Sequence, residues 1–293
     1  MTDFNIELKC QFDRELFWER GDSVRYLVAK VRASDCNSSS RRDREPLNIA
    51  LAIDVSGSMS GGKLEAAKQA ALGLVPKLSS QDRLADNVEV SIQYPAGFHV
   101  EILGKSSSLG HAGRLNVDLG PLQNDVERAV VAKVTCPTSA HKQRFEFTAS
   151  VSARSVGGGE PFQPQFSTAL LMAADRGENA RCPKSSEIAS IVATHWQAHV
   201  LNRAGQMNRD RAFREAANYV ERELRYFEAY VRELPGSREL VRGLKVLARH
   251  VDRDISPRMH KEMTLSSELA FHRRADHRGT AKKSWVDRMV GGD

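Results

Sequence analysis

Apolar and polar residues alternate along most of the first 174 positions, which is the pattern of β-strands that bury one face. Near the N-terminus the alternation predicts two strands between Phe4 and Val31, with a turn at Gly21-Asp22. Short strands spaced as they are further along are typical of an antiparallel β-sandwich, to which we expect the N-terminal strands also to belong. The further strands are predicted over 88–94, 98–103, 114–119, 126–135, 144–154 and 165–173.

After a polar linker over 175–186, apolar residues recur at the three- and four-residue spacing of helices. Ser185 or Ser186 is the expected N-cap of the first helix, because Glu187 follows in its first turn. The sequence therefore predicts a C-terminal helical bundle. Its remaining parts are predicted as a helix over 211–234, a helix capped by Ser237, a helix over 257–272 and a loose tail over 273–293.

One stretch breaks with both patterns. Residues 47–53 form a continuous apolar run with a single polar residue, which is typical of a strand buried on both faces in a parallel sheet. Asp54, Ser56 and Ser58 alternate directly after it, and a helix is predicted over 63–78. Three hard oxygen groups on one short loop suit Mg²⁺, which takes one or two carboxylates and keeps several waters.

The order of strand, Asp-x-Ser-x-Ser loop and helix resembles the first βα unit of a von Willebrand factor A (VWA) domain, as in bacterial VWA proteins. In that family the loop is the first part of a metal-ion-dependent adhesion site, where the metal and a water coordinate a partner's carboxylate. The resemblance implies that Asp54 engages Mg²⁺ directly or through water, while Ser56 and Ser58 supply hydroxyl oxygens. A second interpretation of Asp54 is a cap favoured by the dipole of the helix that follows.

The resemblance ends with this unit. A doubly wound VWA sheet needs about five or six strands, and we find no counterpart of the Gly-Thr and Thr-Asp-Gly loops that complete the family's metal site. We therefore predict an α+β fold, namely an antiparallel β-sandwich with one inserted VWA-like βα unit and a C-terminal helical bundle. The expected divisions are N-terminal strands and linker over 1–46, the shortened VWA-like unit over 47–86, the sandwich over 87–180, and the helical region with its basic tail over 181–293.

The formal net charge of the 293-residue chain is +6, which raises the question of nucleic-acid binding. The excess falls within residues 201–293, which hold 20 Lys and Arg against 14 Asp and Glu, so that 20 − 14 = +6. Along the predicted helices the signs are interleaved, as on a solvated helix face. A solvated face is therefore favoured over a phosphate-binding patch.

The sequence contains no apolar run long enough to span a bilayer and no secretory signal at Met1 to Asn5. The four cysteines are scattered without a CxxC motif, which favours free thiols in a reducing compartment. We expect a cytoplasmic protein with no membrane contact. No nucleophile elbow, phosphate-binding loop or dinucleotide fingerprint is found, so we expect no enzymatic activity. His195 and His199 lie four apart, but packing or surface roles are favoured over metal binding because no third ligand is near.

Three functions are consistent with these patterns. The first is a non-enzymatic protein–protein interaction module of the VWA type, in which the partial site at Asp54, Ser56 and Ser58 binds Mg²⁺ weakly. The second is a shortened structural or assembly protein that has lost metal-dependent adhesion. The third and least favoured is nucleic-acid binding through the basic C-terminal tail. The oligomeric state stays open.

Overall fold

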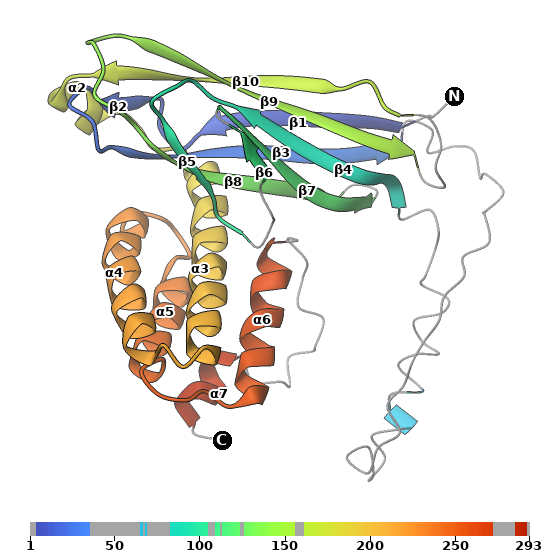
Figure 1. Cartoon of the computed structure of the whole chain (residues 1–293), viewed down its shortest axis with the longest axis vertical. Coiled ribbons are helices and arrows are strands. Elements are labelled where there is room, and N and C mark those ends of the chain that lie inside the picture. The colour runs from blue at the N-terminus through green and yellow to red at the C-terminus, as the bar shows by residue number, and fades with distance from the viewer. Residues whose placement is uncertain are drawn as a thin grey trace.

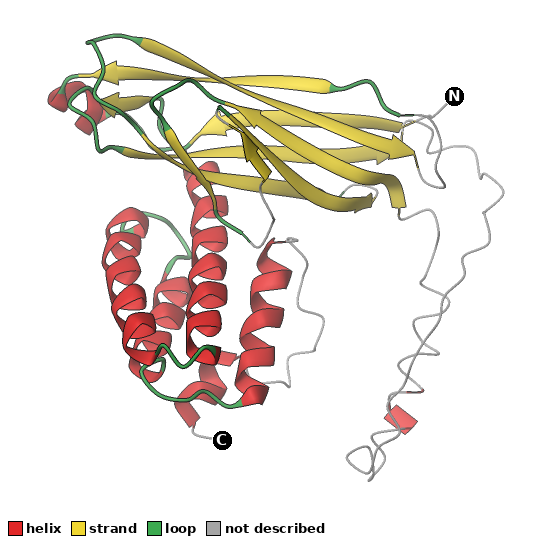
Figure 2. Ribbon diagram, viewed as in Figure 1, coloured by secondary structure: helices red, strands yellow, loops and turns green. Residues whose placement is uncertain are grey.

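The computed structural model of the chain consists of a β-sandwich with a helical bundle packed against one of its faces (Figure 1). Figure 2 shows the division plainly, with the strands in one layered body and the long helices in the other. The structure describes residues 4–35, 65–66, 68, 83–104, 109–111, 113–123, 126–155, 161–271 and 285–291.

Ten described strands form the two sheets of the sandwich, one ordered β1-β3-β8-β5 and the other β2-β10-β9-β4-β7-β6. All their pairings are antiparallel except that of β2 with β10. The strands are β1 (Phe4–Phe12), β2 (Leu16–Trp18), β3 (Val24–Asp35), β4 (Arg83–Gln93), β5 (His99–Ile102), β6 (Leu109–His111), β7 (Arg114–Gln123), β8 (Glu127–Thr135), β9 (Arg144–Ser155) and β10 (Gln165–Ala174).

Strand β4 shows why the alternating sequence folds in this way. Val88, Val90 and Ile92 are fully buried between the sheets, while Glu89 and Gln93 on the other face are exposed. A strand has a side-chain period of two, so the apolar set can face only one way. The alternation thus places β4 in the sandwich with one face open to water, as predicted.

A group of phenylalanines fills one part of the space between the sheets. Phe98 stacks edge to face on Phe145 and Phe147, with ring centroids 4.8 and 5.1 Å apart. Phe12 meets Phe147 in the same geometry at 5.0 Å. Edge-to-face contacts of this kind stabilise by about 0.5–1.5 kcal/mol beyond the area they bury. These rings come from β1, from β9 and from the residue before β5, so they join the two sheets.

Strands β3 and β8 are buried on both faces. In β3 the residues Leu27, Ala29 and Val31 point into the sandwich, and Tyr26 and Val28 point outward into the core of the helical bundle. Strand β8 divides in the same way, with Val130, Ala132 and Val134 inside and Ala129 and Val131 beneath the helices. The bundle therefore covers the centre of the four-stranded sheet.

The described helices follow the sandwich in the chain. Helix α3 has as its N-cap Ser185, one of the two serines predicted, whose hydroxyl accepts the Ile188 amide hydrogen. Figure 1 shows α3 leaving the sandwich with its N-terminal turns nearest the sheet. The helices are α2 (Arg176–Arg181), α3 (Ser186–Arg209), α4 (Phe213–Val231), α5 (Arg238–His250), α6 (Pro257–Phe271) and α7 (Trp285–Gly291).

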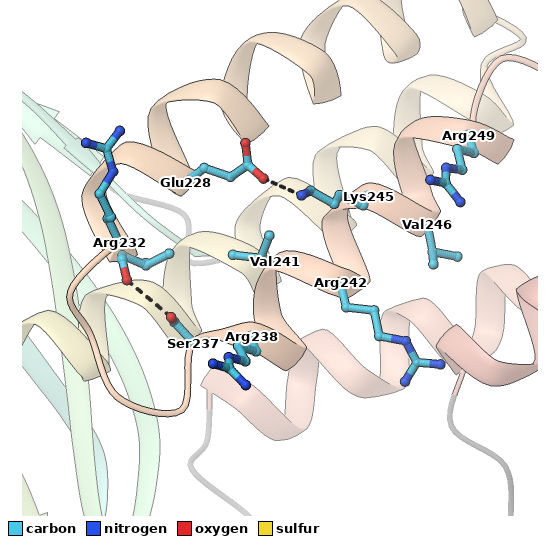
Figure 3. A pocket seen from close by; sticks show the side chains of 10 residues that line it. Glu228, Arg232, Ser237, Arg238, Val241, Arg242, Lys245, Val246 and Arg249 are labelled. Carbon is cyan, nitrogen blue, oxygen red and sulfur yellow. Dashed lines mark hydrogen bonds and ion pairs between the residues drawn. The ribbon is translucent and has the colours of Figure 1, made fainter.

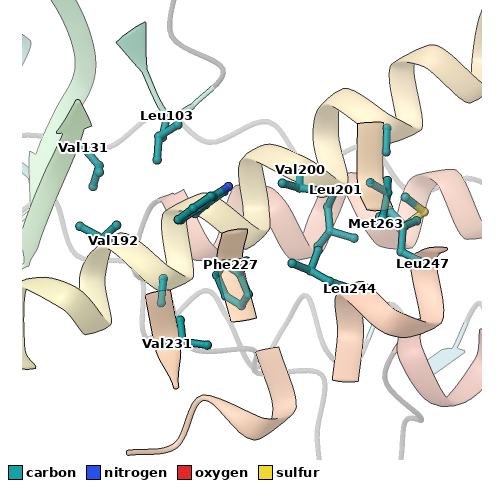
Figure 4. Packing of buried hydrophobic residues seen from close by; sticks show 14 of the residues in the cluster. Leu103, Val131, Val192, Val200, Leu201, Phe227, Val231, Leu244, Leu247 and Met263 are labelled. Atoms are coloured by element: carbon teal, nitrogen blue, oxygen red, sulfur yellow. The ribbon is translucent and has the colours of Figure 1, made fainter. Parts of the chain in front are cut away.

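The bundle core continues the outward face of β3 and β8. Figure 4 shows Leu103 and Val131 at the sheet end, followed by side chains of α3, α4, α5 and α6. Phe227 is fully buried there, with its ring centroid 5.5 Å from that of Trp196 in an edge-to-face contact. Lys30 of β3 also forms an ion pair with Glu187 of α3, which ties the helix to the sheet.

Four short elements depart from the sequence prediction. The predicted linker over 175–186 contains α2, where Asp175 and Glu178 form a reciprocal capping box. The predicted loose tail contains α7, whose Trp285 and Met289 are buried in the bundle core. Strands β2 and β6 were not expected either. Each has three residues, too few to show a period.

The α+β class, the antiparallel sandwich and the C-terminal bundle are confirmed. The predicted VWA-like unit over 47–86 falls almost entirely outside the described residues, which include only 65, 66, 68 and 83–86 of it. None of the described helices is long and apolar enough to cross a membrane.

Candidate interaction site

The predicted metal ligands Asp54, Ser56 and Ser58 lie outside the described residues. The strands on either side of this segment are described. Strand β3 ends at Asp35, which pairs with Phe4 of the four-stranded sheet, and β4 begins in the six-stranded sheet. Figure 1 shows both strand ends at the same end of the sandwich. The chain thus leaves one sheet and enters the other there.

The prediction of a Mg²⁺ site at this loop depends on its set of oxygen donors. One carboxylate and two hydroxyls, from Asp54, Ser56 and Ser58, are hard oxygen ligands of the kind that Mg²⁺ takes together with waters. Elsewhere in the described part of the chain, no group of three or more His, Cys, Asp or Glu side chains could hold a metal ion. The Mg²⁺ site at this loop stays a prediction from the sequence, because Asp54, Ser56 and Ser58 lie outside the described residues.

The described residues form a cleft of about 620 Å³ where the sandwich meets helices α3 and α4. Its walls combine aromatic rings with charged side chains of both signs. The lining includes Trp196, Tyr226 and Tyr230 from the helices, and Asp13, Arg14, Lys133, Lys184, Arg222 and Glu223 around them.

Asp13 is the buried centre of this cleft, with only 3% of its surface exposed. Its carboxylate accepts the Tyr26 amide hydrogen at 2.9 Å and the Tyr230 hydroxyl hydrogen at 3.2 Å. Its backbone carbonyl accepts the amide hydrogen of Ser185, the N-cap of α3, at 2.9 Å. One residue at the end of β1 therefore contacts β3, α3 and α4.

Burial raises the pKa of the Asp13 carboxyl, because desolvation disfavours the charged form. The Tyr26 amide, the positive charge of Arg25 and the Tyr230 hydroxyl act in the opposite direction but do not cancel it. For the same reason burial lowers the pKa of the Arg25 guanidinium, against the charge of Asp13.

Arg25 is held in place by three acceptors. Its guanidinium donates to the carbonyl oxygens of Leu16 and Val24 and to the side-chain oxygen of Asn179 on α2. The planar fork of five N–H donors suits this arrangement, which a lysine could not reproduce. Arg25 thus fixes β2 and α2 against β3 at the base of the cleft.

The helical wall of the cleft presents an aromatic surface. The Lys184 ammonium lies 4.5 Å from the centre of the Tyr230 ring and donates to the Tyr230 carbonyl. The Trp196 indole N–H donates to the Glu223 carboxylate at 2.8 Å. Tyr226, by contrast, is 62% exposed. Tyrosine and arginine are enriched where proteins bind one another tightly, so the cleft has the composition of a protein-binding surface.

The lining residues of this cleft include no histidine, serine or cysteine. His195 and His199 lie away from the cleft lining. His195 is buried beside Phe271, with ring centroids 5.7 Å apart, and burial lowers the pKa of His199. His195 is thus buried, and His199 is partly buried.

Sequence patterns did not reveal Asp13 or Tyr226. Asp13 follows the alternating strand β1 directly and reads as the first polar residue of a turn. In the sequence, Phe227 and Val231 belong to the apolar row that faces the core, and Tyr226 lies on the face next to that row. The one available signal is the pair Tyr226 and Tyr230, spaced i, i+4 on the same face of α4.

No protein-family model matches the chain. Among curated proteins, an uncharacterized protein of Synechocystis sp. is 55% identical over 42 residues, which are 14% of this chain and 10% of that protein. The chain thus matches about one tenth of the length of this relative.

Solved structures similar to the chain include the ArnB paralog VWA2 from Sulfolobus acidocaldarius, 8% identical, covering 92% of this chain and 99% of that one, with a TM-score of 0.45. A von Willebrand factor type A structure from Catenulispora acidiphila is 10% identical, covering 73% and 51%, with a TM-score of 0.38. The major pilin subunit of Bacillus cereus is 4% identical, covering 58% and 40%, with a TM-score of 0.34. VWA structures are thus among those similar to this chain.

Proposed function

We propose that this chain is a non-enzymatic protein–protein interaction module of the VWA type. The observation that carries the proposal is the sequence Asp54-Val55-Ser56-Gly57-Ser58, placed between a predicted buried strand and a predicted helix. The cleft between sandwich and bundle supports it, because exposed Tyr226 and neighbouring Arg222 are residue types that contribute strongly to protein interfaces.

In this proposal Asp54 holds Mg²⁺ directly or through water, and the hydroxyls of Ser56 and Ser58 complete the protein's share of the ligands. The bound ion would supply a positive charge that attracts a carboxylate of the partner protein. With three oxygen ligands on one loop, most of the coordination comes from water, so binding is expected to be weak.

Calorimetric titration of the full chain with Mg²⁺ and Mn²⁺ tests the metal site. The wild type should give measurable heat, and Asp54→Ala should abolish it. Ser60→Ala is the matched control, because Ser60 lies on the same loop but outside the Asp-x-Ser-x-Ser pattern. Equal heats near zero for the wild type and Asp54→Ala would end the metal proposal.

The second candidate is a shortened structural or assembly protein without metal-dependent adhesion. It is favoured by the single ligand loop, since the loops that complete the family's site have no counterpart in the sequence. A lone βα unit leaves the edge groups of its strand without partners, so residues 47–53 should either add to a sandwich edge or pair with another subunit. Hydrogen exchange on the monomer separates these cases, because protection of those amides indicates pairing within the chain.

We further propose a reducing, cytoplasmic location. Cys10, Cys136 and Cys182 support it, because all three are buried and free in the structure. Cys36 lies outside the described residues.

A further inference from the structure

A second concave surface lies on the bundle, well separated in sequence from the Asp54 loop. It is a groove of about 590 Å³ between α4 and α5 (Figure 3). Five of its ten lining residues are cationic and one is acidic. The cationic residues are Arg232, Arg238, Arg242, Lys245 and Arg249, and the acid is Glu228.

Two of these cations already have carboxylate partners. Lys245 forms an ion pair with Glu228 at 2.7 Å, which links α5 to α4 across the groove, as Figure 3 shows. Arg242 contacts Glu239 at 3.3 Å and Asp287 of α7 at 3.0 Å. Within the described part of the chain, no carboxylate pairs with the other three, which are Arg232, Arg238 and Arg249. The groove therefore keeps an excess of positive charge.

The charges follow one face of α5. Arg238, Arg242, Lys245 and Arg249 are spaced i, i+4, i+7 and i+11, so they form a row along about three turns, or roughly 16 Å. Three valines also line the groove, of which Val241 is partly exposed and the other two are buried. They are Val231 from α4, and Val241 and Val246 from α5.

We infer that this groove binds an acidic amphipathic helix of a partner protein. The partly exposed Val241 offers a contact to the apolar face of such a helix, whose anchors recur at i, i+3, i+4 and i+7. The cationic row then faces acidic side chains on the flanks of that helix. Complementary charge of this kind speeds association and fixes the register of the bound helix.

Nucleic acid fits the groove less well. Its lining contains no aromatic side chain on which a base could stack. Glu228, Glu239 and Asp287 already neutralise two of its cations, whereas a phosphate backbone needs a surface of one sign. Carboxylates of a helix can instead meet Arg238 and Arg249 singly, at two ends of the row.

Fluorescence anisotropy with the full chain tests this inference. The probe is a labelled synthetic helix of about 18 residues, long enough to be helical, with leucines on one face and glutamates on both flanks. A second probe has alanine in place of each leucine, and a third is single-stranded DNA of about 20 nucleotides. Binding is measured at about 0.15 M and about 0.5 M salt.

The decisive variant combines Arg238→Glu with Arg249→Glu. Its matched control combines Arg214→Glu with Arg225→Glu, which makes the same change in net charge on exposed residues of α4 that do not line the groove. The first should weaken binding of the leucine probe about tenfold or more, and the control about twofold or less. Far-ultraviolet circular dichroism of both variants reports whether each is folded.

A third variant, Val241→Thr, tests the apolar contact at Val241. It should weaken binding of the leucine probe and leave the weaker binding of the alanine probe unchanged. Equal weakening by both charge variants would overturn the inference, as would absence of binding or tighter binding of DNA than of the leucine probe. Binding by this groove should not change with Asp54→Ala or with chelation of Mg²⁺, so it stands or falls separately from the proposed metal site.

Discussion

The Tyr230 hydroxyl donates a hydrogen bond of 3.2 Å to the Asp13 carboxylate, across the boundary between the helical bundle and the sandwich. The same carboxylate accepts the Tyr26 amide hydrogen, so a buried acid with a raised pKa lies where the two parts meet. Four predictions concern this junction, the two cores beside it and their cysteines.

The first prediction concerns the pH dependence of stability. Because the folded chain binds the Asp13 proton more tightly than the unfolded chain, this group favours folding at low pH. Its contribution falls as the pH rises from the ordinary value of 3.8 through the raised folded pKa. Asp13→Asn keeps an acceptor for the Tyr26 amide but cannot ionise. The free energy of unfolding of the variant should therefore rise relative to the wild type as the pH increases over that range.

Urea denaturation at a series of pH values measures this difference. Asp22→Asn is the control, because Asp22 lines the same cleft but is exposed. A constant difference between Asp13→Asn and the wild type across the series would contradict the prediction.

The second prediction concerns the bundle core. Phe227 is fully buried against Trp196, so Phe227→Ala should lower the free energy of unfolding by about 3–5 kcal/mol. Its neighbour Tyr226 is mostly exposed, and Tyr226→Ala should change stability by about 0.5 kcal/mol or less. Chemical denaturation of both variants makes the comparison. Similar losses for the two would mean that this helix face is not packed as described.

The third prediction concerns Arg25. Arg25→Lys keeps the positive charge. A lysine cannot donate hydrogen bonds to the Leu16 and Val24 carbonyls and to the Asn179 side-chain oxygen at the same time. Buried acceptors left without donors cost about 1–3 kcal/mol each, so we expect a loss of stability of about 2 kcal/mol. The exposed Arg20→Lys should be neutral. A neutral effect at both positions in denaturation experiments would show that the three hydrogen bonds contribute little.

The fourth prediction concerns the thiols. Burial raises the pKa of Cys10 and of Cys136 to about 12, so at pH 8 the thiolate fraction is on the order of one in ten thousand. In a Cys36→Ser background, Ellman's reagent should react slowly with the native chain and rapidly once urea unfolds it. Rapid modification of Cys10 or Cys136 in the native chain, located by mass spectrometry, would refute their burial.

Alternation and helical spacing were sufficient to predict the long elements. Strands β8 and β9 were expected over 126–135 and 144–154, and the structure has them at Glu127–Thr135 and Arg144–Ser155. The N-cap of α3 was predicted to be Ser185 or Ser186 and is Ser185, because hydroxyl capping is a local interaction that a short sequence can specify. Helix α7 was missed, because a seven-residue segment depends on burying Trp285 rather than on its own propensity.

The candidate sites were less predictable. Asp13 contacts Tyr230 over 217 positions of sequence, and no local pattern connects such a pair. The interleaved charges of 201–293 predicted a solvated face, and Arg238, Lys245 and Arg249 are exposed on α5. Their gathering along one groove was not predicted, although the turns of a helix bring every third or fourth residue together. For the Asp54 loop the reverse holds, because the sequence predicts its ligands but the structure does not describe it. The pattern of oxygen ligands at Asp54, Ser56 and Ser58 can be recognised in the sequence, and these residues lie outside the described part of the chain.

Alternate side chains of strand β3 point in opposite directions. One set packs in the sandwich interior, and the other set packs in the bundle core. A shift of a single residue in the pairing of β3 with β8 would exchange the two sets and damage both cores at once. The two parts of the chain should therefore lose structure in one cooperative step on heating, rather than as two bodies joined by a tether.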